Sequence, residues 1–137
     1  MKKRKKEKVK KMENKYFKNL TQAERKILAN KGTEAPFSGE YNNHFEKGYF
    51  VCRACNNKLY ESKTKFDSGC GWPAFHSEDS DACISRIVDV THGMVRTEVR
   101  CGTCDAHLGH VFKDGPRKHG GERYCINSAA MEFEVKE

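Results

Sequence analysis

The sequence predicts a mainly β domain of short antiparallel strands, preceded by one short helix and tied together by a structural metal site. Two observations carry this prediction. Segments rich in β-branched and aromatic residues alternate with turn residues between positions 48 and 135, which is typical of hairpins. Two Cys-x-x-Cys pairs stand at such turns. Of the 137 residues, 36% are hydrophobic, which supports a modest core, and small domains of this kind often add a metal.

The basic character of the chain is confined to its first 18 residues. They hold ten Lys and Arg against two Glu, whereas residues 19–137 hold sixteen Lys and Arg against seventeen Asp and Glu. A block of like charge predicts a disordered leader over residues 1–18, followed by a single domain over 19–137. The leader either attracts nucleic acid or anionic lipid weakly or is a solvated tail. Because the folded part is not basic, we expect no specific nucleic-acid binding.

The sequence predicts a protein of the reducing cytoplasm. No apolar run approaches the length that crosses a membrane. No apolar segment follows the basic start, as a secretory signal would require. The seven cysteines are an odd number, which excludes a fully paired disulfide framework. We therefore expect no membrane partner, and nothing in the sequence demands more than a monomer.

The first regular element is a short helix. Thr21-Gln22-Ala23-Glu24 forms a capping box, in which the Thr hydroxyl and the Glu carboxylate satisfy early backbone N–H groups. We expect the helix to run to about Lys31 and to end at Gly32. The next segment, residues 33–48, predicts irregular structure laid over a core, with a turn at Phe37-Ser38.

The rest of the chain predicts strands. Residues 49–51 and 58–60 flank the first cysteine pair as a hairpin. Residues 84–90 and 94–101 predict a second hairpin with its turn at Thr91-His92-Gly93. In its second strand, Val95, Thr97 and Val99 alternate with charged residues, which predicts a half-buried strand. Further strands are expected at residues 107–112, 123–127 and 131–135.

The two Cys-x-x-Cys pairs predict one structural zinc site. Four thiolates complete the tetrahedral coordination of zinc and leave no open position. The pairs are separated by 45 residues, so the fold has to bring them together. A thioredoxin-type redox pair is the alternative, but it requires a βαβ context that is missing here. The predicted ligands are Cys52, Cys55, Cys101 and Cys104.

Three cysteines remain outside the predicted metal site. On a strand, Arg123, Cys125 and Asn127 point to one face, and a guanidinium favours the nucleophilic thiolate. The alternative for Cys125 is a small buried residue. Cys70 lies between two glycines, on a backbone mobile enough for a resolving thiol to reach its partner. Cys83 follows an acidic run that raises a thiol pKa, which makes it the weaker nucleophile.

Two histidines and one tryptophan complete the candidate chemistry. His107 and His110 directly follow the second cysteine pair and are free for acid–base work near neutral pH. The alternative is metal ligation together with the cysteines. Trp72, the only tryptophan, precedes a proline in the segment around Cys70. It either forms the wall of an apolar pocket or seals the core.

In combination, these motifs closely resemble the methionine sulfoxide reductase B family over about residues 20–135. The motifs occur in the family's order, namely Cys52–Cys55, Phe66–Phe75, His92–Met94, Cys101–Phe112, Asp114–Pro116 and Gly121–Ser128. The resemblance implies a β-tent fold of two antiparallel β-sheets with one structural Zn²⁺. It also implies reduction of the R epimer of methionine sulfoxide, free or within proteins.

The resemblance implies a role for each candidate residue. Cys125 matches the family's nucleophile and Cys70 the resolving cysteine, which leaves Cys83 as a bystander. Arg123 matches the charge that supports the thiolate. The groups that bind and protonate the sulfoxide oxygen match His107, His110 and Asn127. The substrate pocket is expected to include Trp72, against the substrate methyl group, with Phe75, Val111 and Phe112.

The chemistry of sulfur then predicts the reaction sequence. A Cys125 thiolate attacks the sulfoxide sulfur, a histidine protonates the oxygen, and methionine leaves a sulfenic acid on the enzyme. Cys70 condenses with the sulfenic acid to a disulfide, which an external dithiol reduces. By resemblance, that dithiol is thioredoxin. The rival functions are a non-enzymatic zinc domain that binds a protein or single-stranded nucleic acid, and a thiol peroxidase or disulfide oxidoreductase.

Overall fold

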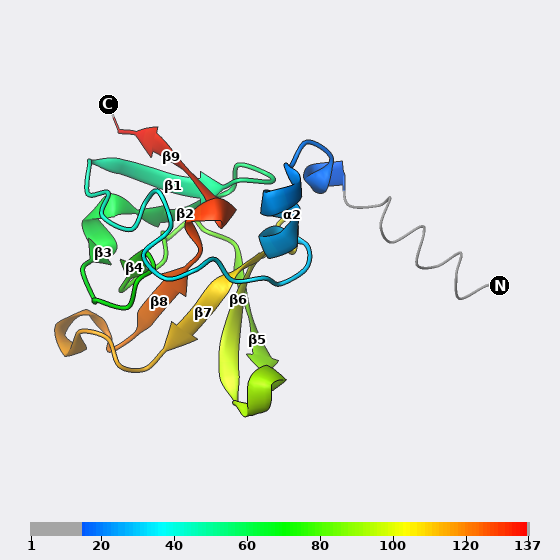
Figure 1. Cartoon of the computed structure of the whole chain (residues 1–137). Helices are drawn as coiled ribbons and strands as arrows, with labels where there is room; N and C mark the ends of the chain where they lie inside the picture. Colours follow the sequence, from blue (N-terminus) through cyan, green and yellow to red (C-terminus); the bar gives the residue numbers. More distant parts are fainter. Residues whose placement is uncertain (1–14, 137) are drawn as a thin grey trace.

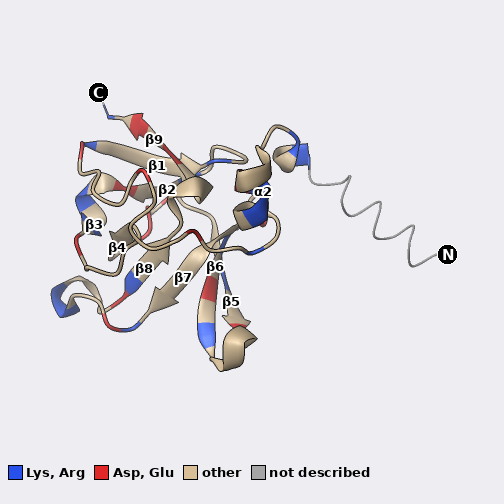
Figure 2. Cartoon of the chain, viewed as in Figure 1, with Lys and Arg blue, Asp and Glu red and all other residues tan. Residues whose placement is uncertain are grey.

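The structure is a computed structural model that describes residues 15–136 (Figure 1). Of the predicted basic leader, residues 1–14 lie outside the described residues. Over the described part, acidic and basic residues are interspersed along the chain (Figure 2). A single α-helix, α2 (Gln22–Leu28), is present in this part, together with short 3₁₀ turns such as η1 (Lys15–Phe17). None of the described helices is long and apolar enough to cross a membrane.

The capping box predicted for the helix is confirmed. The backbone N–H of Glu24 donates to Thr21 Oγ1 at 3.1 Å, and that of Thr21 donates to Glu24 Oε1 at 2.9 Å. The helix ends at Leu28, earlier than the predicted end at Lys31. Lys31 itself takes the left-handed conformation, with φ of 60°, and the N–H of Gly32 donates back to Lys26 O. The chain therefore reverses one residue before the expected glycine.

The strands form two antiparallel sheets, as the fold prediction requires (Figure 1). A three-stranded sheet has the order β2-β1-β9 and a six-stranded sheet the order β3-β4-β8-β7-β6-β5. The bounds are β1 (Gly48–Cys52), β2 (Lys58–Glu61), β3 (Lys65–Phe66), β4 (Ala74–Phe75), β5 (Ile84–Asp89), β6 (Arg96–Cys101), β7 (His107–Phe112), β8 (Arg123–Ile126) and β9 (Met131–Val135).

Both predicted hairpins are confirmed, because β1 pairs with β2 and β5 pairs with β6. Strands β3 and β4 were not predicted from the sequence. Each holds only two residues, which is too short to show an alternating pattern. They nevertheless matter for the site, because β4 pairs with β8 through Ala74 and Cys125.

The alternation predicted for β6 is only partly correct. Val99 is fully buried, but Val95 is 82% exposed and Glu98 is fully buried on the opposite face. The hairpin of β5 and β6 extends away from the rest of the fold, so its tip has no second sheet against it (Figure 1). Glu98 tolerates burial because three cationic or imidazole side chains contact its carboxylate.

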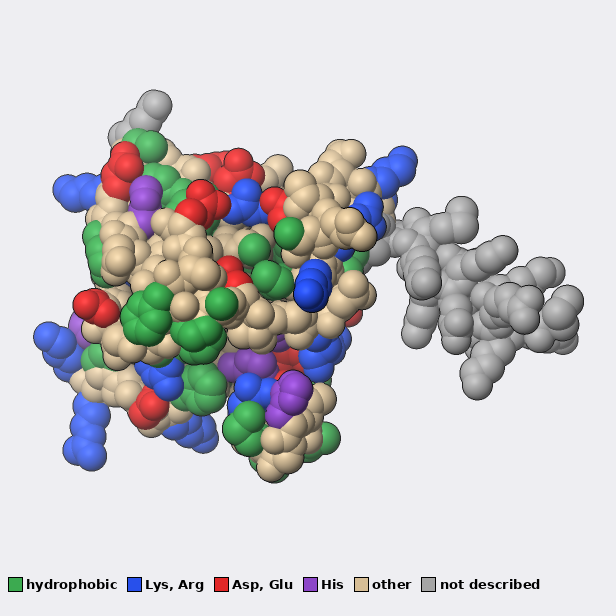
Figure 3. Space-filling model, viewed as in Figure 1, with side chains coloured by type: hydrophobic (Ala, Val, Ile, Leu, Met, Phe, Trp, Pro, Cys, Tyr) green, Lys and Arg blue, Asp and Glu red, His purple; other side chains and the backbone are tan. Residues whose placement is uncertain are grey.

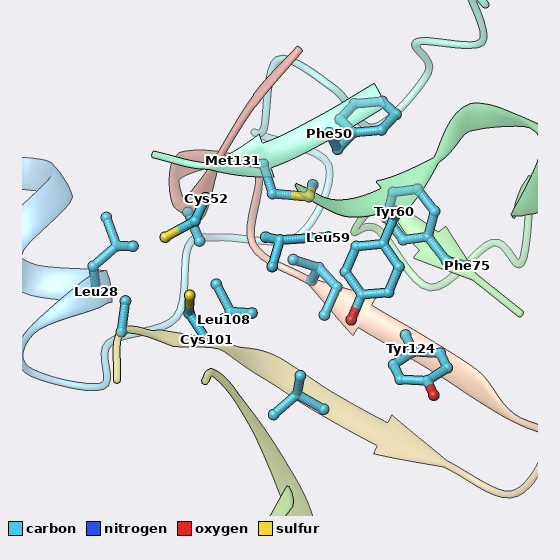
Figure 4. Close-up of a cluster of buried hydrophobic side chains, with 14 of the residues drawn as sticks. Leu28, Phe50, Cys52, Leu59, Tyr60, Phe75, Cys101, Leu108, Tyr124 and Met131 are labelled. Carbon is cyan, nitrogen blue, oxygen red and sulfur yellow. The ribbon is translucent and has the colours of Figure 1, made fainter. Parts of the chain in front are cut away.

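The core lies between the two sheets and is rich in aromatic rings (Figure 4). Tyr60 of β2 and Phe75 of β4 stack with ring centroids 4.4 Å apart and an interplanar angle of 13°. Both are fully buried, and Val111 of β7 belongs to the same cluster. Phe75 and Val111 were expected in the substrate pocket. The structure instead places them on the core face, because β4 and β7 turn alternate side chains to opposite faces.

We expect Phe75→Leu to lower the free energy of unfolding by about 1–2 kcal/mol, because it removes a buried ring stack. Urea unfolding measures the change. Phe37→Leu is the matched control, since Phe37 is 69% exposed and its loss should change stability by less than about 0.5 kcal/mol. Equal effects of the two substitutions would contradict this assignment of Phe75 to the core.

Candidate active site and metal site

The four cysteines of the two Cys-x-x-Cys pairs converge on one point. Their Sγ atoms all lie within 4.8 Å of one another. Cys52 Sγ lies 3.6 Å from Cys104 Sγ, and Cys55 Sγ lies 3.5 Å from Cys101 Sγ. Four sulfurs about 2.3 Å from a tetrahedral zinc are about 3.8 Å apart, so the donor set and its spacing fit such an ion. The sequence prediction that the fold brings the four cysteines together is confirmed, and their arrangement could hold a metal ion.

The two cysteine turns share one local geometry. In the first, Asn56 N donates to Cys52 O at 2.8 Å, and in the second, Asp105 N donates to Cys101 O at 2.8 Å. Asn56 and Asp105 both take positive φ, near 65°. Asn and Asp tolerate that left-handed conformation better than most residues. The repeated turn directs two sulfurs from the β1–β2 connection and two from the β6–β7 connection toward the same point, so the cluster joins the two sheets.

The second candidate site is built around Cys125 in β8. Its neighbours across the sheet are Ala74 in β4 and His110 in β7. Cys70 Sγ lies 3.1 Å from Cys125 Sγ. Cys70 is carried by an irregular segment in which Gly69 and Gly71 take φ of 75° and 93°, a conformation that suits glycine. The two thiols predicted to form a nucleophile and resolving pair are therefore in contact.

Arg123 shares the face of β8 with Cys125, as predicted. Its Nη1 donates to Cys125 Sγ at 2.6 Å. Asp114 holds the same guanidinium through two hydrogen bonds, from Nε at 2.8 Å and from Nη2 at 3.0 Å. The ring of Phe112 lies 4.6 Å below the guanidinium carbon. A bidentate carboxylate and an aromatic face fix the position of this charge beside the sulfur.

The contact between the two thiols separates their ionisations. The hydrogen bond with Cys125 lowers the pKa of the Cys70 thiol to about 5. The same hydrogen bond, with burial, raises the pKa of Cys125, while the guanidinium of Arg123 acts to lower it. Arg123 acts to lower the pKa of both thiols. Its guanidinium therefore stabilises a negative charge wherever it resides on the pair.

Each of the two histidines is paired with a buried carboxylate. His110 Nε2 lies 2.8 Å from Asp89 Oδ2, and His107 Nδ1 lies 2.8 Å from Glu98 Oε2. His110 borders the cavity around Cys125, whereas His107 is only 2% exposed and lies behind it. Burial lowers the pKa of His107, against the effect of Glu98. The geometry thus separates a histidine at the cavity from one beneath the surface.

Asn127 lines the cavity but is also part of the framework. Its Nδ2 donates to Leu108 O at 3.0 Å, and its Oδ1 accepts from the N–H of Glu34 at 3.0 Å. The Glu34 carboxylate in turn accepts from two backbone N–H groups that follow Asn127. The Glu34 carbonyl accepts from Trp72 Nε1 at 3.0 Å. Asn127 therefore holds the segment that positions the tryptophan.

A cavity of about 230 Å³ opens beside the two thiols. Its walls are Thr33, Cys70, Trp72, Arg96, Gly109, His110, Phe112, Arg123, Cys125 and Asn127. Seven of the predicted site residues are thus together, and the exceptions are His107, Phe75 and Val111. Cys83 is exposed and lies at the second cysteine turn, where its carbonyl accepts from Gly102 N.

Several wall and supporting residues were not predicted. Thr33, Arg96 and Asp89 showed no motif of their own, and Glu98 was one of the charged residues that alternate along a half-buried strand. Asp114 stood in a motif of the resemblance but was given no role. A signal was present at Gly109, because a glycine inside a strand often marks a close approach. A Cβ at Gly109 would overlap the carbonyl of Cys125. The burial of Asp89 and Glu98 has no local signal, since their histidine partners and Lys31 come from other segments.

Comparisons with known proteins agree on one family. The family model described as the SelR domain matches residues 20–135. A *Caenorhabditis elegans* protein named "Probable methionine-R-sulfoxide reductase B" is 59% identical over 113 residues, which cover 82% of this chain and 74% of that protein. A *Hahella chejuensis* protein named "Peptide methionine sulfoxide reductase MsrB" is 47% identical over 127 residues, which cover 93% and 91%. An *Escherichia coli* K12 protein with the same name is 50% identical over 116 residues, which cover 85% and 84%.

We expect alkylation of the reduced Cys70–Cys125 pair by iodoacetamide to rise through about pH 5 and to be lost below it, where both thiols are protonated. In Arg123→Gln the midpoint should move up by about one unit or more, because a stabilising charge is removed. Peptide mapping by mass spectrometry separates this pair from the exposed Cys83. Arg117→Gln, on an exposed turn, is the control, and an equal shift in both variants would contradict the role given to Arg123.

Proposed function

Because the chain belongs to the methionine sulfoxide reductase B family, that of the SelR domain, we propose that it reduces methionine-R-sulfoxide, free and within proteins, to methionine. The observation that carries the proposal is the cavity in which Cys125 contacts both a fixed guanidinium and a second thiol. A non-enzymatic metal domain would have no need of this arrangement.

In the proposed reaction, the Cys125 thiolate attacks the electrophilic sulfur of the sulfoxide. The sulfoxide oxygen passes to Cys125 as a sulfenic acid, and methionine is released. The oxygen has to be protonated in this step. His110 borders the cavity and is held by Asp89, so we assign it the role of acid. The ring of the buried His107 packs against that of His110 with centroids 5.6 Å apart, and Asn127 holds Leu108 of the same strand.

The second half of the proposed cycle restores the enzyme. The Cys70 thiol attacks the sulfur of the Cys125 sulfenic acid, a disulfide forms and water leaves. The 3.1 Å separation of the two sulfurs and the glycines beside Cys70 support this step. An external dithiol, which we propose is thioredoxin, reduces the disulfide by exchange and becomes a disulfide itself. A reducing compartment such as the cytoplasm suits this cycle, and we propose a monomer there.

The substrate methyl group is proposed to lie against apolar walls. Trp72 and Phe112 border the same cavity as Cys125. An indole held by a hydrogen bond from Nε1 to Glu34 O offers a fixed apolar surface. Phe75 and Val111 contribute only as part of the core beneath.

The four-cysteine site is proposed to hold one zinc ion. Cys52, Cys55, Cys101 and Cys104 supply four thiolates, so the ion has no open position for a substrate. It would contribute to folding by joining the two sheets, and no reaction step passes through it.

We expect the reduced protein with dithiothreitol to reduce the R epimer of N-acetyl-methionine sulfoxide and to leave the S epimer. Cys125→Ser should lose activity by at least about a thousandfold, because the nucleophile is removed. The matched control, Cys83→Ser, should retain it. Chiral chromatography of the products measures both. Turnover of hydrogen peroxide in place of either sulfoxide would contradict the proposal and favour a thiol peroxidase.

We expect one zinc per chain by elemental mass spectrometry. Cys104→Ser should lose the ion and lower the free energy of unfolding by on the order of 5 kcal/mol, since metal binding is coupled to folding. Cys83→Ser, a thiol beside the site but outside the cluster, should keep both the zinc and the stability. Full stability of Cys104→Ser without metal would contradict a structural ion.

A further inference from the structure

A second cavity adjoins the one that contains Cys125. Its volume is about 180 Å³, and it shares Thr33, Arg96 and His110 with the first cavity. The remaining walls are Lys31, Asp89, Thr91, His92 and His107. The cavity lies where the β5–β6 hairpin meets the segment that follows α2. A substrate whose sulfoxide occupies the first cavity would therefore present its neighbouring groups to the second.

The carboxylates around this second cavity are buried and fully engaged. The Asp89 side chain is 2% exposed. It accepts hydrogen bonds from the backbone and hydroxyl of Thr91, contacts His110, and lies 3.6 Å from Arg96 Nη2. The Glu98 side chain is 1% exposed, and it is bound by Arg100, His107 and Lys31. Neither acid presents a free oxygen to the cavity surface.

The cations, in contrast, reach the surface of the cavity. The Lys31 side chain is 38% exposed and that of Arg96 is 21% exposed. Two buried nitrogen atoms at these walls, Arg96 Nε and His107 Nε2, have no hydrogen-bond partner among the described residues. Figure 3 shows basic and histidine side chains gathered at the base of the β5–β6 hairpin. Because His107 Nδ1 donates to Glu98, its Nε2 is an acceptor, so the unsatisfied donor is Arg96 Nε. The cavity therefore offers one buried guanidinium donor together with the positive charge of Arg96 and Lys31.

We propose that this second cavity is a subsite for a carboxylate of the substrate. The carboxylate is either the α-carboxylate of free or C-terminal methionine sulfoxide or the side chain of an acidic residue next to it. A planar two-oxygen anion matches the fork of a guanidinium, and a second cation at Lys31 adds attraction. The inference deepens the proposed function and rests on it. The subsite favours sulfoxide substrates that carry a carboxylate next to the methionine sulfoxide side chain.

Four substrates test the subsite on the reduced full chain. Two differ only in charge at the α-carbonyl, namely N-acetyl-methionine-R-sulfoxide and its N-methylamide. The other two place a Glu or a Gln after the sulfoxide in an amidated dipeptide. We expect a threefold to fivefold higher kcat/KM for the charged member of at least one pair, mainly through KM. The preference should shrink in 0.5 M salt, which screens exposed charges. The pair that responds identifies the source of the carboxylate.

Variants assign the preference to the cavity. Lys31→Gln and Arg96→Gln should each lower the ratio of kcat/KM for the charged substrate to kcat/KM for the neutral one toward one. Arg96→Lys should restore part of this ratio. The ratio cancels any general loss of activity from changes near His107 or His110. Lys63→Gln is the control, because it removes a cation that is also paired with a carboxylate but lies outside both cavities. Its ratio should equal that of the unchanged protein.

The outcomes separate this inference from the proposed function. Reduction of all four substrates with equal kcat/KM would overturn the subsite and leave the reductase in place. A preference that persists in both Lys31→Gln and Arg96→Gln would also overturn it. Failure to reduce any of the four would overturn the proposed function and the subsite together.

Discussion

The convergence of four sulfurs is the constraint on which the rest of the structure depends. Cys52 ends β1 in the three-stranded sheet, and Cys101 ends β6 in the six-stranded sheet, so the cluster fixes one sheet against the other. Strand β7 begins three residues after the last of these cysteines. Its position sets where His107 and His110 stand, and its pairing with β8 places His110 opposite Cys125. The four-cysteine cluster thus takes no part in the proposed reaction, but it fixes the strands that carry His107, His110 and Cys125.

Each basic or imidazole group at the candidate active site is held by a carboxylate. Arg123 contacts the sulfur and is itself held by Asp114, while His110 is held by Asp89 and His107 by Glu98. Asp89 and Glu98 are buried and Asp114 is exposed, and each holds a basic or imidazole group near the cavities. This arrangement stabilises negative charge on the thiol pair and leaves positive charge for a substrate. The same pairing accounts for the reactive thiols and for the proposed carboxylate subsite.

Much of this could be predicted from the sequence, where the signal is local. The capping box at Thr21, both hairpins and the shared face of Arg123 and Cys125 follow from patterns within a few residues. The buried position of Phe75 could not be predicted, because β4 is two residues long and shows no period. The burial of Glu98 depends on partners from other segments, Lys31 and His107 among them. Such contacts are decided by the tertiary fold, and the subsite around Arg96 likewise exists only once the segment that follows α2 meets the β5–β6 hairpin.

The central claim is that Cys125 and Cys70 act in sequence on a sulfoxide. A free-thiol count by mass spectrometry tests it most directly, on zinc-bound reduced protein before and after one equivalent of methionine-R-sulfoxide without a reductant. The account predicts the loss of two thiols, with one peptide linking Cys70 to Cys125 and one methionine released. An unchanged thiol count in folded, fully reduced protein would contradict it.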